Sequence, residues 1–213
     1  FINHHSAADA MLTLCDNPLT KKDATYWLFR NAIGEWRDYD LMAELKKRGI
    51  YDPDKVVALS IAAPRQEKPK FSVEDVLKFK GNAPKGKTTA TRCIMCHEFD
   101  GAGIDYGPSL KGWGGGQPAD VIARAIVDPT ADISHGFKGT TLQLKDGKKI
   151  QGLALAKTDP TTITSTGGVT QLIPRKMIKN QSGMNYSLML SADQMGLSPQ
   201  DVADLVAFLK EYK

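Results

Sequence analysis

The stretch Cys93-Ile94-Met95-Cys96-His97 contains two of the three cysteines of the chain and one of its four histidines. Two thiols three positions apart, near the end of a helix, can bond to two side groups of one planar macrocycle, and the adjacent imidazole then faces its centre. Cys-x-x-Cys-His is the attachment signature of haem c. The stretch therefore predicts one covalently bound haem, with thioethers at Cys93 and Cys96 and with His97 as a ligand of the iron.

Two other interpretations of this stretch fit its surroundings less well. A thioredoxin-like cysteine pair would follow a strand and open a helix. Here residues 82–92 are predicted to form a short helix, and residues 98–116 a glycine-rich loop. A zinc site would need a second pair of ligands, and His4, His5 and His135 do not supply one.

The composition is that of an ordinary globular protein, with 213 residues, 41% of them hydrophobic and 24% charged. The formal charge of +4 indicates a weak preference for an acidic partner. Basic clusters with interleaved aromatic residues are missing from the sequence, so binding to nucleic acid is not expected. No apolar run reaches the length of about 18 residues that would predict a transmembrane segment.

The first residues, Phe1-Ile2-Asn3-His4-His5, lack the charged and apolar regions of a signal peptide. Either a leader has been removed or the chain is a piece of a longer protein. Because haem c is attached outside the cytoplasm, the predicted location is the periplasm or another extracytoplasmic compartment.

A turn-like stretch, Gly107-Pro108-Ser109-Leu110, follows the cysteines by about ten residues. In small c-type cytochromes a Gly-Pro-x-Leu stretch lies at this distance, and its proline carbonyl accepts a hydrogen bond from the ligand histidine. We therefore expect Pro108 to orient the His97 ring. The alternative is a plain turn, because Gly-Pro is a turn signal in any protein.

A C-terminal helix is predicted to begin after Ser198, a suitable N-cap, with Pro199 in its first turn. One apolar face follows at helical spacing, formed by Val202, Leu205, Val206 and Leu209. In cytochrome c folds such a helix crosses the helix before the haem motif. Gly86 would allow that close approach, with Phe208 or Tyr212 opposite it.

A methionine before this helix would complete a His/Met ligand pair, which raises the reduction potential. Met189 has the most suitable loop position, while Met184 and Met195 remain alternatives. Met195 is expected to lie too near the start of the helix, and Met177 is expected to be attached to a strand.

Seven stretches between Phe71 and Lys213 follow one pattern: Lys80-Gly81-Asn82, Gly86-Lys87, Cys93 to His97, Gly107 to Leu110, Ile126 to Pro129, Ser187 to Met189, and Asp201 to Leu205. In these stretches the chain resembles the haem-binding domain family abundant in planctomycete and verrucomicrobial proteins, a variant of the class I cytochrome c fold. The resemblance implies that Met189 is the axial ligand and that Pro108 is the partner of His97. Leu190 departs from the family, which usually has proline there.

The expected fold is mainly α: a cytochrome c fold with a small antiparallel β insertion, preceded by a small N-terminal helical segment. Residues 1–64 form the helical segment, residues 65–72 a linker, and residues 73–213 the cytochrome c domain. The insertion, at about 140–178, is predicted from strand-like runs separated by Asp146-Gly147 and Gly167-Gly168. It would cover one haem edge, offer a docking surface, or be a surface embellishment.

Helices are predicted in the N-terminal segment from Thr20 to Gly34, from Leu41 to Arg48, and from Asp52-Pro53 onwards. Cys15 follows an apolar run and is predicted to be a buried free thiol. No chemistry is recognisable in this segment. Family members often carry such helices between larger modules, including dehydrogenase-like ones, so the resemblance suggests an electron-accepting module of a larger protein.

The leading hypothesis is electron transfer, without enzymatic activity, through one haem c ligated by His97 and Met189, to or from a redox partner protein. The second hypothesis is a haem enzyme or sensor with an open sixth coordination site for peroxide or a small gas. The third is a haem-free module in which Cys93 and Cys96 form a redox or metal pair.

Overall fold

The structure, a computed structural model, describes residues 4–31, 36, 39–64, 67–156 and 159–213. Helices account for 35% of the described residues and strands for 16%, with five strands in one antiparallel sheet. The prediction of a mainly α fold was therefore wrong, and the class is α/β. The reason is that the sheet carries a buried apolar core of its own, which includes Leu142, Ile150 and Ile163.

Four helices belong to the part of the chain that carries the Cys93–His97 stretch: α4 (Val73–Leu77), α5 (Ala83–Thr89), α6 (Ala119–Val127) and α7 (Pro199–Glu211). Short 3-10 helices are η1 (Ala90–Arg92), η2 (Gly114–Gly116) and η3 (Arg175–Met177). Helix α7 begins as predicted, because Ser198 and Asp201 form a reciprocal capping box and Pro199 occupies the first turn.

Helices α5 and α7 cross in direct contact at Gly86. A Cβ atom on Gly86 would lie 2.0 Å from the carbonyl oxygen of Asp204 and 2.8 Å from Cβ of Phe208, so only glycine fits without a shift. The predicted close approach is confirmed. The buried carboxylate of Asp204 adds two hydrogen bonds at the crossing, accepting from the backbone N–H of Asn82 and from the side chain of Gln200, each at 2.8 Å.

The sheet consists of β3 (Thr140–Leu144), β4 (Lys149–Ala156), β5 (Thr161–Ser165), β6 (Val169–Ile173) and β7 (Ile178–Gly183), in the order β6-β5-β4-β3-β7. Hairpin turns at Asp146-Gly147 and Gly167-Gly168 are present as predicted, and the three glycines have positive φ values of 89°, 82° and 76°. Two very short strands, β1 (Glu98–Phe99) and β2 (Ala102–Gly103), form a separate hairpin directly after His97.

The N-terminal segment contains α1 (His5–Leu14), α2 (Lys21–Asn31) and α3 (Leu41–Lys47), which pack around a common apolar cluster. Cys15 is a buried free thiol, as predicted, and its Sγ lies 3.6 Å from Oγ1 of Thr25. The predicted end of the helix that begins at Thr20, at residues 33–34, lies outside the described residues. Residues 65–66 of the predicted linker also lie outside them.

The helix predicted from Asp52-Pro53 was wrong. Oδ1 of Asp52 accepts the backbone N–H of Asp54, and its carbonyl accepts that of Lys55, so the chain turns here instead of entering a helix. Residues 56–63 then run in an extended conformation along the sheet. The N–H of Ile61 donates to Lys149 and the carbonyl of Ile61 accepts from Gln151, at 3.1 and 2.8 Å.

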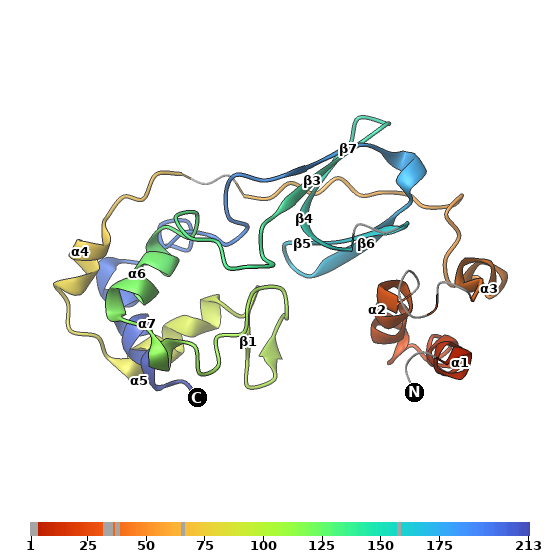
Figure 1. The fold of residues 1–213 in the computed structure, drawn as a ribbon. Helices are drawn as coiled ribbons and strands as arrows, with labels where there is room; N and C mark the ends of the chain where they lie inside the picture. The colour runs from red at the N-terminus through yellow and green to blue at the C-terminus, as the bar shows by residue number, and fades with distance from the viewer. Residues whose placement is uncertain (1–3, 32–35, 37–38, 65–66, 157–158) are drawn as a thin grey trace.

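Figure 1 shows the sheet between two groups of helices, α4–α7 on one side and α1–α3 on the other. No helix among the described residues is long and apolar enough to cross a membrane.

Candidate functional site

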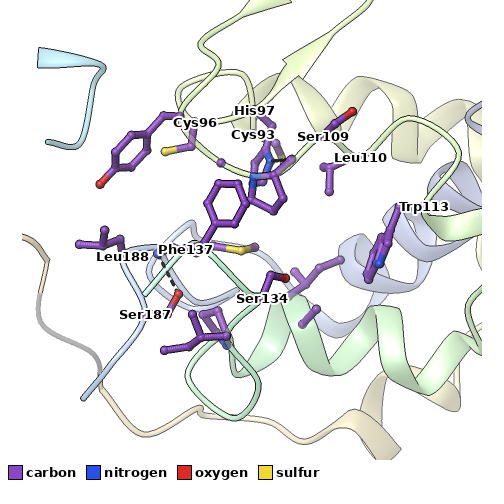
Figure 2. Close-up of a pocket in the computed structure, with 18 of the residues that line it drawn as sticks. Cys93, Cys96, His97, Ser109, Leu110, Trp113, Ser134, Phe137, Ser187 and Leu188 are labelled. Atoms are coloured by element: carbon purple, nitrogen blue, oxygen red, sulfur yellow. Dashed lines mark hydrogen bonds between the residues drawn. The ribbon is translucent and has the colours of Figure 1, made fainter. Parts of the chain in front are cut away.

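The Cys93–His97 stretch lines an apolar pocket. Helices α6 and α7, together with loops and the sheet, form its other walls. The pocket contains about 1160 Å³ of empty space, part of it open to solvent. Figure 2 shows Cys93, Cys96 and His97 on one wall and Phe137, Ser187 and Leu188 facing them from across the pocket. Among the described lining residues, Asp132 is the one with a carboxylate, and most of the others are apolar.

His97 is held from two sides. Its Nδ1 lies 2.8 Å from the carbonyl oxygen of Pro108, the contact that the Gly-Pro-x-Leu stretch predicts. A carbonyl oxygen can only accept, so Nδ1 carries the hydrogen and Nε2 keeps its lone pair for a ligand bond. Gly107 packs against the ring, because a Cβ atom there would lie 2.5 Å from Cε1 of His97.

The electrostatics of His97 favour a neutral imidazole. Burial lowers the pKa of His97, and the hydrogen bond to Pro108 opposes this effect in part. The ring is therefore neutral at pH 7, which is the form that binds a metal ion.

Cys93 and Cys96 are half-buried free thiols beside His97. Burial, together with the neighbouring Cys96, raises the pKa of Cys93 to about 11, and burial raises the pKa of Cys96 as well. Reactive redox cysteines have lowered pKa values, so this surrounding is unlike that of a thioredoxin-type pair.

The three donor groups do not converge on one point. No group of three His, Cys, Asp or Glu side chains in the described ranges is placed to hold a bare metal ion. Separate bonds from two thiols and one imidazole to different atoms of a large planar group suit this arrangement better.

A pH series of alkylation tests the state of the thiols in haem-free protein. Because the pKa of Cys93 is about 11, the thiolate fraction and the alkylation rate with iodoacetamide are expected to rise about tenfold per pH unit from pH 7 to pH 10. Peptide mass spectrometry at Cys93 measures the rate. A rate that levels off near pH 7 would instead identify an activated thiolate.

Two of the candidate methionines line the pocket and two do not. Met189 and Met195 are lining residues. Met184 is buried beside Gly139 and Leu188, and Met177 packs against the core of the sheet. Of the four methionines considered as a second axial ligand, only Met189 and Met195 therefore line the pocket.

Met195, expected to lie too near the start of α7 to reach back over the haem, is a lining residue of the pocket. Its N–H donates to Ser191 at 3.1 Å in a turn that folds the chain back before α7. The guanidinium of Arg92 donates to the carbonyl oxygens of Met195 and Gly196, each at 3.1 Å, and so ties this turn to the segment that carries the cysteines.

The loop of Met189 is anchored by hydrogen bonds along its backbone. The N–H of Met189 donates to Oγ of Ser187 at 3.1 Å, and the N–H of Ser187 donates to Oγ1 of Thr130 at 3.1 Å. Further along, the N–H of Ala192 donates to the carbonyl of Ile126 in α6 at 2.9 Å. These contacts fix the loop against the part of the chain that follows α6.

Sequence reasoning missed several walls of the pocket: Trp113, Ile133, Phe137 and Leu153. Leu153 belongs to β4, so the sheet supplies part of the pocket and is more than a surface embellishment. These residues carry no local motif, and only the long-range packing of their elements brings them together.

The residues of the pocket fit a haem. Cys93, Cys96 and His97 come from one wall, Met189 and Met195 come from others, and the remaining lining is largely apolar, as cofactor sites are. A scan of protein-family models finds no match to this chain, and a search of curated proteins finds no similar sequence. The assignment of the site therefore depends on the chemistry of its own residues.

Proposed function

We propose that this protein carries electrons through one haem c, bound covalently by Cys93 and Cys96 and ligated by His97 and Met189. The haem supplies one-electron redox chemistry when bound. The observation that carries the proposal is the hydrogen bond from Nδ1 of His97 to the carbonyl of Pro108, beside two thiols at the wall of an apolar pocket. It leaves Nε2 as the ligand atom with a fixed direction.

Each part of the pocket has a role in this proposal. Pro108 and Gly107 hold the imidazole, the first by the hydrogen bond and the second by contact with the ring. Such support raises the basicity of a ligand histidine and fixes its orientation. The apolar walls, including Leu153 of β4, exclude water, and a low local polarity is one of the means by which proteins set a reduction potential.

Covalent attachment of the haem also indicates the cellular compartment in which the protein would work. Two thioethers keep the cofactor from dissociating, which suits a protein that works in an open extracytoplasmic compartment, and haem c is attached there. We therefore propose a periplasmic or other extracytoplasmic location, with a redox partner protein as the binding partner.

Optical spectra of protein matured in a host that attaches haem c test the ligand pair. We expect sharp low-spin bands and a far-red sulfur-to-iron band in the wild type. Met189→Ala is expected to abolish the far-red band and to lower the reduction potential, because a thioether ligand raises it. Met177→Ala, at the core of the sheet, is the matched control and is expected to keep both.

The other outcomes identify the alternatives. Loss of the far-red band in Met195→Ala, with Met189→Ala unchanged, would assign the ligand to Met195. A high-spin wild-type spectrum would replace electron transfer by an open-site haem protein. A colourless protein without thioethers would overturn the proposed function.

A further inference from the structure

A second hollow lies over the sheet and has a different character from the apolar pocket. It contains about 1480 Å³ of empty space, open solvent included, and it is lined by residues of β3, β4, β5 and β7 and by the chain next to them. Three exposed cationic side chains border it: Lys138 before β3, Arg175 in η3 and Lys179 in β7. We name this hollow, bordered by these three residues, the basic groove. Strands β3 and β7 run side by side at that edge of the sheet (Figure 1).

The sequence segment that forms the sheet and this groove carries the excess of positive charge. Residues 138–183 contain eight lysines and arginines and two aspartates, a formal charge of +6, whereas the whole chain has +4. The rest of the chain is therefore net negative. Residues 138–183, rather than the segments before and after them, carry the excess of positive charge.

The charges of the groove are not neutralised within the described part of the chain. No carboxylate described there lies within 4.0 Å of the cationic group of Lys138, Arg175 or Lys179. Neither of the two aspartates in this segment forms an ion pair with these three cations. Asp146 pairs with Lys148 at 2.9 Å, and Asp159 accepts the backbone N–H of Arg175 at 2.9 Å.

The groove adjoins the pocket. Phe137 lines the pocket and Lys138, the next residue, lines the groove, so their Cα atoms are about 3.8 Å apart. Gly139 closes the space between them, because a Cβ atom there would lie 2.7 Å from Sδ of Met184 and 3.0 Å from Cγ of Leu188, another residue of the pocket.

We propose that the basic groove is the docking site for an acidic segment of the redox partner protein, an inference that rests on the proposed function. Exposed, unpaired cations lose little hydration on contact and steer an acidic surface toward a defined face. A site for a small anion would instead hold its cations buried and converging. Docking here brings the partner beside the wall of the pocket that Phe137 forms, the position that electron transfer requires.

Binding of fluorescent poly-L-glutamate to the full chain tests this inference. The wild type is expected to bind the probe with an affinity that falls as salt is raised. The variant K138E/R175E/K179E is expected to lose about tenfold or more in affinity, because it removes three cations from one site. The matched control K80E/K85E/K87E changes the net charge equally at exposed lysines of and before α5, and it is expected to lose less than about threefold.

The neutral variant K138Q/R175Q/K179Q separates lost attraction from added repulsion or misfolding, and it is expected to show an intermediate loss with an unchanged circular dichroism spectrum. Equal losses in the two charge-reversed variants would overturn the groove as the site. Displacement of the probe by inorganic phosphate, but not by chloride of the same ionic strength, would show a small-anion site and overturn docking of an acidic segment.

The binding assay does not depend on the haem, so the two proposals fail separately. Normal haem spectra without probe binding at the groove would overturn the docking site alone. Probe binding at the groove by a protein that never acquires haem would overturn electron transfer, and with it the redox nature of the partner.

Discussion

The variant Cys93→Ala/Cys96→Ala is expected to contain no covalently bound haem, while each single variant keeps at most one thioether. Both thiols lie at the wall of the apolar pocket beside His97, and no other cysteine of the chain is near. The readout is haem staining after denaturing electrophoresis, together with the mass of the intact protein. The expected effect is complete loss of the stained band, because coordination by His97 does not survive denaturation.

Cys15→Ala is the matched control for this experiment, since it makes the same chemical change at the third cysteine. Cys15 is buried in the cluster of α1–α3, next to Thr25, and takes no part in the pocket. The control is expected to retain the full haem signal. Haem that stays on the double variant through denaturation, or a signal that disappears in Cys15→Ala, would contradict the assignment.

Gly86→Ala is expected to destabilise the folded protein by about 2 kcal/mol. The new Cβ atom would lie 2.0 Å from the carbonyl oxygen and 2.5 Å from the carbonyl carbon of Asp204, so α5 and α7 must separate. Overpacking costs about 1–3 kcal/mol, and the upper end applies because the obstacle is backbone. The better helix propensity of alanine offsets up to about 1 kcal/mol of that cost. Urea unfolding followed by circular dichroism measures the difference.

Gly116→Ala provides the comparison. A Cβ atom at Gly116 meets no atom within 4 Å, and its φ is not in the left-handed region. A change of less than about 0.5 kcal/mol is therefore expected. If Gly86→Ala is as mild as Gly116→Ala, the two helices do not cross as closely as described.

Local features of the fold could be predicted from the sequence because their causes are local. Capping by Ser198 and the turns at Asp146-Gly147 and Gly167-Gly168 each depend on a few neighbouring residues with fixed conformational preferences. The contact between His97 and Pro108 could be predicted for a similar reason, since the two residues are only eleven positions apart and the motif specifies both.

The extent of the sheet, and with it the fold class, could not be predicted in the same way. Strand β7, with the sequence Ile-Lys-Asn-Gln-Ser-Gly, shows no alternation of apolar and polar residues and is defined by its pairing with β3. Without it, and without residues 56–63 alongside β4, the strands resemble a small insertion. The prediction of a mainly α class failed for that reason.

The site was predictable where one short stretch supplies it and not where distant elements meet. Cys93, Cys96 and His97 follow from five residues of sequence. Leu153 and Phe137 enter the pocket only through long-range packing. That Met195 lines the pocket could not be predicted, because the turn at Ser191, held in part by Arg92, is a tertiary feature that the distance to α7 along the chain does not reveal.

The extended run of residues 56–63 has a consequence for how this protein can be divided. Ala58 and Ala63 are buried in clusters with residues of the sheet, and the N–H of Ala63 donates to the side chain of Gln151 at 2.9 Å. A truncation at residue 64, between the predicted segments, would remove these contacts from β4 and expose an apolar surface of the sheet to water. The smallest unit suited to gene fusion or domain grafting therefore begins before residue 56, although the Cys93–His97 stretch lies almost forty residues further on.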